Sequence, residues 1–214
     1  MSSFDSSCRA CERLAGFLDE VRAQHPLYFS APVPPFGAAD ARLVIVGLAP
    51  GMHGANRTGR PFTGDYAGIL LYETLHKFGF ATAPVSQSAD DALQLIDCRI
   101  TNSVKCLPPE NKPVTAEIAR CNRFLAHELA VIEYSHAILA LGAIAHAAVL
   151  RALALKARDW PFAHGAEHRL SARVTLFDSY HCSRYNTQTR RLTTPMFEAV
   201  FARVRAHVDA LRRV

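Results

Sequence analysis

The chain has 214 residues, with 24 Lys and Arg against 19 Asp and Glu, so its formal net charge is +5. Half of the residues are apolar and a fifth are charged, a balance that excludes a disordered chain and allows one sizeable core. We find no internal repeat, low-complexity stretch or obvious linker. We therefore expect a single domain over residues 1–214.

The sequence also predicts where the protein works. No apolar run reaches the roughly 18 residues that a membrane span needs, and the N-terminus lacks the basic start and apolar stretch of a secretory signal. We therefore expect a cytoplasmic protein. Because that compartment keeps thiols reduced and disfavours structural disulfides, the six cysteines call for another explanation.

Apolar runs alternate with helical patterns along the chain. Residues 8–24 predict a helix, because Leu14, Leu18 and Val21 recur at offsets of three and four. Residues 43–46 form a short continuous apolar run, typical of a strand buried on both faces. Asp65 is placed to cap the next helix. The further pattern predicts helices over 66–78, from Thr115, over 142–155 and over 195–211, and strands over 97–104, 136–141 and 174–180.

This alternation predicts a three-layer α/β/α fold with a four-stranded, mostly parallel central sheet. In such sheets the ligand site lies beyond the carboxyl ends of the strands. Three chemically rich loops follow predicted strands, at residues 47–65, 101–106 and 181–193. We expect them to converge on one edge of the sheet.

Four of the six cysteines fall into two pairs. Cys8 and Cys11 form a CxxC at the start of the first predicted helix, and Cys106 and Cys121 bracket the loop and helical turn after the second predicted strand. Four thiolates from two segments can enclose one metal centre, and both Zn²⁺ and an iron–sulfur cluster accept such a set. The alternative is four isolated thiols that pack as small apolar side chains.

The first loop, residues 47–65, is dense in glycine, which allows the backbone to approach a ligand closely. It lacks the Gly-Lys-Ser/Thr of a phosphate-binding P-loop. Phe62 is flanked by turn-forming residues and is a candidate stacking platform for a planar base. An aromatic side chain packed beneath its own loop would give the same pattern. On the residues alone, Asp65 is either a helix cap or a catalytic carboxylate.

The other two loops are polar. Asn102 ends the second predicted strand, and its amide can donate and accept together, as reading the edge of a base requires. Residues 181–193 are basic and almost free of acid, which suits contacts to a phosphodiester backbone, although a solvated loop would look alike. His181 directly follows a strand and can donate a hydrogen bond to charge that develops on a substrate.

Together these segments resemble the uracil-DNA glycosylases of the iron–sulfur type, most closely family 5, the type B enzymes. The resemblance runs from Cys8 to about Thr193 and is carried by the four cysteines and three motifs, GLAPGMHGANRTGRPFTGD, TNSVKCLPPENKP and HCSRYNTQTRRLT. It implies a monomer that excises uracil, and other deaminated bases such as hypoxanthine, from DNA, with no membrane partner. The expected reaction flips the nucleotide out and hydrolyses its N-glycosidic bond, leaving an abasic site.

The resemblance also implies a role for individual residues. Phe62 would stack on the flipped base, Asn102 would contact its edge, His181 would stabilise the leaving base and Asp65 would be the acid that assists cleavage. A structural [4Fe–4S] cluster would be held by Cys8, Cys11, Cys106 and Cys121. Gly47 and Ala49 are the remaining residues expected at the base. Contacts to DNA are expected from Asn56, Arg57, Arg60, Lys105, Ser183, Arg184, Asn186 and Arg190.

Two positions depart from the pattern of the superfamily. Ala49 stands where the best-known uracil glycosylases hold the Asp that orients the attacking water, so the acid must come from elsewhere, and Asp65 is the nearest candidate. His181 is followed by Cys182 instead of the usual proline. A non-catalytic, zinc-containing nucleic-acid-binding protein is the main alternative. A small-molecule hydrolase or transferase is disfavoured by the absence of a G-x-S-x-G elbow and of a P-loop.

Overall fold

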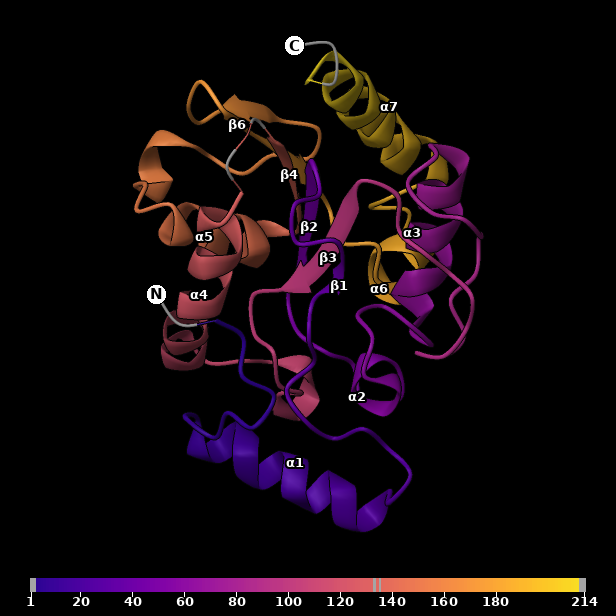
Figure 1. Ribbon diagram of the computed structural model, residues 1–214, viewed down its shortest axis with the longest axis vertical. Coiled ribbons are helices and arrows are strands. Elements are labelled where there is room, and N and C mark those ends of the chain that lie inside the picture. Colours follow the sequence, from indigo (N-terminus) through magenta and orange to yellow (C-terminus); the bar gives the residue numbers. More distant parts are fainter. Residues whose placement is uncertain (1–2, 133, 135, 212–214) are drawn as a thin grey trace.

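The computed structural model describes residues 3–132, 134 and 136–211, and a mixed six-stranded sheet runs through its centre (Figure 1). The strand order is β1-β3-β2-β4-β6-β5, in which the four inner strands are parallel and the two edge strands are antiparallel to their neighbours. The bounds are β1 Phe36–Gly37, β2 Leu43–Gly47, β3 Cys98–Asn102, β4 His136–Leu141, β5 Glu167–Arg169 and β6 Val174–Ser179.

The four inner strands are those that the sequence predicted, but the expectation of a four-stranded sheet was wrong. The two additional strands are β1, with two residues, and β5, with three. Neither is long enough to show a period of two, and the residues of β5 are polar, as edge strands often are. These two strands therefore form because they pair with a longer neighbouring strand, β1 with β3 and β5 with β6.

Helices cover both faces of the sheet, as the three-layer prediction required. α3 (Tyr66–Lys77) and α7 (Thr194–Leu211) pack on one face, and α4 (Thr115–Ala130) and α5 (Ala143–Ala152) on the other (Figure 1). Within β2, Leu43 and Ile45 belong to the first core and Val44 and Val46 to the second. This double burial explains the continuous apolar run in the sequence.

Three further helices lie at the end of the molecule towards which the inner strands point: α1 (Glu12–Gln24), α2 (Ala55–Thr58) and α6 (Arg184–Gln188). The predicted start of the first helix was wrong, because α1 begins at Glu12. Cys11 occupies the N-cap position in an extended conformation and Cys8 precedes it. The sequence did not predict α2 or α6, since helices of four or five residues carry too little periodicity.

The connections place a crevice at the carboxyl end of β2. Both β3 and β4 pair with β2, one on each side of it. The chain runs from β2 to β3 and then crosses to the other side of β2 to form β4, so the strand order reverses at β2. Gly47, the last residue of β2, is level with Asn102 at the end of β3. Among the described residues, no helix combines the length and the apolar character needed to cross a membrane.

Candidate active site and four-cysteine cluster

A cleft of about 450 Å³ opens at the carboxyl ends of the inner strands, a volume in the range of small-molecule sites. It brings together the three loops that the sequence analysis selected. Five of the six residues predicted to bind the base or to assist cleavage line it, namely Ala49, Phe62, Asp65, Asn102 and His181. The other residues of its wall are Leu48, Gly51, Tyr66, Ala67, Asn111, Ser183 and Arg184.

The inner wall of the cleft is formed by Phe62 and Asn102. The Phe62 ring lies 5.8 Å from the His181 ring, centroid to centroid, with 28° between their planes. Asn102 is 4 % exposed, and its Oδ1 has no hydrogen-bond partner among the described groups. A Cβ on Gly47 would lie 2.4 Å from that oxygen and 2.8 Å from Phe62 Cζ. Only glycine fits here, and the amide oxygen of Asn102 stays available to a ligand.

Asp65 directly precedes α3 but does not cap it through its side chain. Instead its Oδ2 accepts a hydrogen bond from the Ala55 N–H at 3.2 Å. A Cβ on Gly51 or Gly54 would lie 2.5 Å and 1.9 Å from the carboxyl group, so two glycines make room for it. Burial raises the pKa of Asp65 above its ordinary value, although the Ala55 N–H and the nearby Arg57 oppose the rise.

His181 lies two residues after the end of β6, and burial lowers its pKa to about 4. Its imidazole is therefore neutral near pH 7 and can donate a hydrogen bond without carrying charge. The His181 carbonyl accepts a hydrogen bond from Asn186 Nδ2 at 2.8 Å, and Ser183 Oγ accepts one from the Asn186 N–H at 3.4 Å. The Asn186 side chain, expected on DNA, thus holds the loop that carries His181.

Lys105 and Asn56 are buried, which corrects their expected role as DNA contacts. Lys105 is 1 % exposed, and its Nζ pairs with Glu128 Oε1 at 2.7 Å and also donates to Thr101 Oγ1. Asn56 is fully buried in α2. Neither side chain can reach a phosphate without opening the structure.

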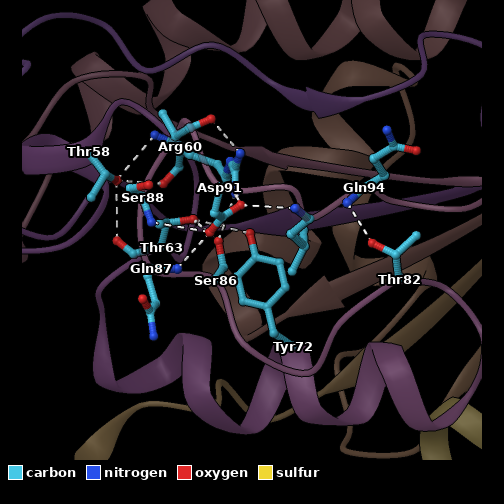
Figure 2. A network of polar contacts seen from close by, with 12 residues as sticks. Thr58, Arg60, Thr63, Tyr72, Thr82, Ser86, Gln87, Ser88, Asp91 and Gln94 are labelled. Carbon is cyan, nitrogen blue, oxygen red and sulfur yellow. Dashed lines mark hydrogen bonds and ion pairs between the residues drawn. The ribbon is translucent and has the colours of Figure 1, made fainter.

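Arg60 is corrected for the same reason. Figure 2 shows it within a polar network beneath the first loop, where its guanidinium donates to Asp91 Oδ1 at 2.5 Å and to Ser86 Oγ at 3.1 Å. It also donates to the Ala89 carbonyl at 2.6 Å, and its exposure is 6 %. Arg60 therefore holds the segment that follows α3 against the first loop. Its position in a glycine-rich motif does not indicate this structural role.

Three of the expected cations remain on the surface: Arg57, Arg184 and Arg190. Arg57 Nε donates to the His53 carbonyl at 2.7 Å. The Arg184 guanidinium lies 5.5 Å from the centroid of the Tyr66 ring, and both residues line the cleft. This contact joins the first loop to the third.

The sequence analysis missed Tyr66 and Asn111 as residues of the cleft. Asn111 belongs to the segment after Cys106, and it has φ +57° after Glu110 with φ +53°. Asn is among the residues that tolerate this left-handed region, so the Glu-Asn-Lys-Pro run could have indicated a tight turn. That the turn presents Asn111 to the cleft depends on the packing of the whole loop.

The two cysteine pairs converge on one small cavity. Cys8 and Cys11 precede α1, Cys106 follows β3 and Cys121 lies in α4, and all four line the same cavity with an apolar surround. Burial, together with the neighbouring thiols, raises the pKa of Cys106 to about 12. Such a group of thiols loses its protons when a metal centre supplies the compensating charge.

The chemistry of the four side chains suits a metal centre, since both Zn²⁺ and an iron–sulfur cluster accept four cysteine thiolates. The Lys105 N–H donates to Cys121 Sγ at 3.3 Å and Arg123 to Cys8 Sγ at 3.6 Å. The site therefore fits a metal centre bound by four thiolates.

Comparison with known proteins agrees with this geometry. The model of the uracil DNA glycosylase superfamily matches residues 34–205, so the chain belongs to that superfamily. It is 44% identical over 197 residues to a type-5 uracil-DNA glycosylase of Thermus thermophilus, a match that covers 90% of each protein. It is 45% identical over 205 residues to a type-5 uracil-DNA glycosylase of Mycobacterium leprae, covering 92% of this chain and 89% of the relative. A type-4 uracil-DNA glycosylase of Thermotoga maritima is 39% identical over 110 residues, 51% of this chain.

Proposed function

We propose that this chain is a monofunctional uracil-DNA glycosylase that acts as one domain and as a monomer. It hydrolyses the N-glycosidic bond of uracil in DNA and leaves an abasic site. The observation that carries this proposal is the cleft whose lining includes an aromatic ring, an unpaired amide oxygen, a half-buried carboxyl group and a neutral imidazole.

The first step is the extrusion of the damaged nucleotide into the cleft. Extrusion costs a few kcal/mol and is least costly at a mispair. We propose that the base stacks on Phe62 and pairs its edge with the Asn102 amide, whose free Oδ1 would accept a hydrogen bond from a base N–H. Gly47 leaves room for both side chains.

The second step is cleavage of the bond between base and sugar. As this bond lengthens, positive charge grows on the sugar and negative charge on the base. The Asp65 carboxylate would stabilise the sugar cation and orient the attacking water, and neutral His181 would donate a hydrogen bond to the base oxygen. Ala49 has no polar group for either task. Preorganised partners for both charges lower the barrier because they need not reorient during the reaction.

The rim of the cleft would hold the DNA backbone. Arg57, Arg184 and Arg190 are exposed, and Ser183 lies at the mouth of the cleft. Contacts of this kind fix position on the duplex and make binding depend on salt. We propose these four residues, and not Asn56, Arg60 or Lys105, as the contacts to DNA.

We further propose that Cys8, Cys11, Cys106 and Cys121 hold a [4Fe–4S] cluster. The cluster would supply a covalent tie between the N-terminal segment and the loop after β3, with no electron transfer in the reaction. Its neighbours Lys105 and Arg123 would donate hydrogen bonds to the thiolates. Brown protein with about four iron atoms per chain is expected, whereas colourless protein that contains zinc would contradict this assignment.

Cleavage of a duplex oligonucleotide with one uracil tests the function. Under single-turnover conditions we expect an abasic product from the uracil strand and none from the same strand with thymine. Hypoxanthine in the same position tests the wider range of deaminated bases that we propose. A purified, iron-loaded protein that binds the duplex and leaves uracil in place would overturn the proposal.

A further inference from the structure

A turn between α5 and β6 is tied to the strand that leads to His181. Within the turn, the Ala166 N–H donates to the Ala163 carbonyl at 2.9 Å. Both backbone groups of Asp178 bind the turn, since Gly165 N–H donates to its carbonyl at 2.8 Å and its N–H donates to the Ala166 carbonyl at 3.0 Å. Gly165 has φ +80°, a conformation that favours glycine. These contacts fix the turn beside Asp178, which lies three residues before His181 in the chain.

The buried Asp178 side chain fastens the same segment to the sheet. Its oxygens lie 2.8 Å from His146 Nδ1 and 3.1 Å from His168 Nε2, and His146 Nε2 lies 2.8 Å from the Trp160 carbonyl. These residue types can bind a metal, but the distances are those of hydrogen bonds. Burial opposes a charge on His146, yet Asp178 holds its pKa above the ordinary value. When it is protonated, His146 can donate to both acceptors, the Asp178 carboxylate and the Trp160 carbonyl.

His164 lies at the tip of this anchored turn and holds Tyr180, the residue directly before His181. Its Nδ1 accepts a hydrogen bond from the Tyr180 N–H at 3.1 Å. The two rings stack at 4.9 Å between centroids with 16° between their planes. The Arg191 guanidinium lies 4.6 Å from the centroid of the same Tyr180 ring. Both the backbone and the ring of Tyr180 are thus held, at the point where the third loop begins.

The protonation state of His164 suits this contact. A nitrogen accepts a hydrogen bond only when it carries no proton. Burial lowers the pKa of His164, and the Arg203 guanidinium on α7 lowers it further, while a hydrogen bond with the Met196 backbone opposes both. The neutral ring can therefore accept from the Tyr180 N–H through Nδ1 and use its second nitrogen at Met196.

We propose that His164 is a positioning residue, which acts on cleavage by fixing the backbone before His181. This inference rests on the proposed function. The hydrogen bond and the stack hold Tyr180 against the turn at His164, so that the His181 ring keeps its place beside Phe62 at 5.8 Å. Nothing in the sequence indicates this role, because His164 is one of ten histidines and lies outside the three motifs.

A double-mutant cycle tests the proposal. His164→Ala removes the acceptor and the stack, and we expect the single-turnover cleavage rate to fall about 5- to 10-fold, as for one lost hydrogen bond. Affinity for a duplex with a non-cleavable uracil analogue should stay within about two-fold. In a His181→Ala background the same change should alter the rate less than two-fold, because the two residues act as one unit.

Two further variants separate positioning from general destabilisation. His164→Asn keeps an acceptor close to the place of Nδ1 and should restore the rate to within about two-fold of the wild type. His76→Ala, at an exposed position on α3, should leave the rate unchanged. An equal loss for His164→Ala in both backgrounds, or a His164→Asn variant as slow as His164→Ala, would overturn the proposal.

One measurement needs neither variant nor substrate. Amide hydrogen exchange in the wild-type protein should show the Tyr180 N–H as protected at neutral pH, because a bonded amide exchanges only when the structure opens. Fast exchange at Tyr180 would show that the hydrogen bond does not exist and would refute the positioning role. Failure to cleave uracil, with Tyr180 protected, would instead refute the proposed function.

Discussion

The cleft and the cysteine cluster share one short segment, residues 102–106 at the end of β3, yet the polar groups of the two regions differ in whether they are paired. Asn102 faces the cleft with an unpaired oxygen, whereas Lys105, three residues further on, is paired with Glu128 and next to Cys121. A site for a transient ligand keeps its polar groups available. A region that holds a permanent structure pairs its charges inside the protein, because unpaired buried charge is costly.

The largest expected effect comes from removing the buried ion pair between Lys105 and Glu128. Lys105→Met leaves the Glu128 carboxylate buried without its partner, so we expect the free energy of unfolding to fall by about 3–5 kcal/mol. Denaturant titration measures this. Arg184→Met, at the exposed rim, should leave stability within about 0.5 kcal/mol and reduce the salt dependence of DNA binding by about one unit of slope. If Lys105→Met instead changed the salt slope, Lys105 would belong with the rim.

Removing a proposed catalytic side chain from the cleft should slow the cleavage reaction and leave the fold unchanged. His181→Ala removes one preorganised donor, for which we expect a loss of about 10²–10³ in the single-turnover cleavage rate. Affinity for duplex DNA and the visible absorbance of the proposed iron–sulfur cluster should persist. A rate near that of the wild type would remove His181 from the catalytic residues.

A smaller effect should follow from filling space in the cleft without removing any polar group. In Gly54→Ala the new Cβ would lie 1.9 Å from the Asp65 carboxyl carbon, so Asp65 must move. We expect the cleavage rate to fall about 10- to 100-fold, a fraction of the effect of losing a catalytic group. Gly16→Ala is the matched control, since no atom lies within 4 Å of its added Cβ. Equal rates for the two variants would show that Asp65 needs no fixed position.

The smallest effect concerns the pH dependence of stability. His181 has a pKa of about 4 in the folded chain and about 6.5 when unfolded. Between these values the unfolded state binds more protons, so stability decreases as pH falls from 6.5 towards 4. We expect His181 to account for about 1–2 kcal/mol of the loss between pH 7 and pH 5. His181→Leu should flatten the curve, measured by denaturant titration at each pH, and a curve of unchanged slope would contradict the shifted pKa.

The sequence analysis succeeded for the elements with strong periodicity and for the residues next to them. β2 and most of β4 are continuous apolar runs, and β3 and β6 are short apolar stretches mixed with polar residues; their alternation with helical patterns allowed all four to be recognised. The prediction that the three loops converge was confirmed, since Phe62, Asp65, Asn102 and His181 line one cleft; it could be made because each loop follows a strand and a parallel sheet brings strand ends together.

The errors have a common cause. Arg60, Lys105 and Asn56 look like DNA contacts, because a basic or amide side chain in a motif loop carries no sign of whether it points inwards or outwards. Burial depends on partners distant in the chain, such as Asp91 for Arg60 and Glu128 for Lys105. The edge strands β1 and β5 were missed because strands so short form only beside an existing neighbour.

By itself, the amino-acid sequence determined the layered fold, the positions of the inner strands, the two cysteine pairs and the loops that carry the chemistry. These follow from local patterns of apolar and polar residues. Only the tertiary structure decided which polar side chains are available and which are paired, that the four cysteines line one cavity, and that His164 accepts a hydrogen bond from the backbone before His181. Those features depend on distances between segments remote in sequence, and contacts of that range are set by packing.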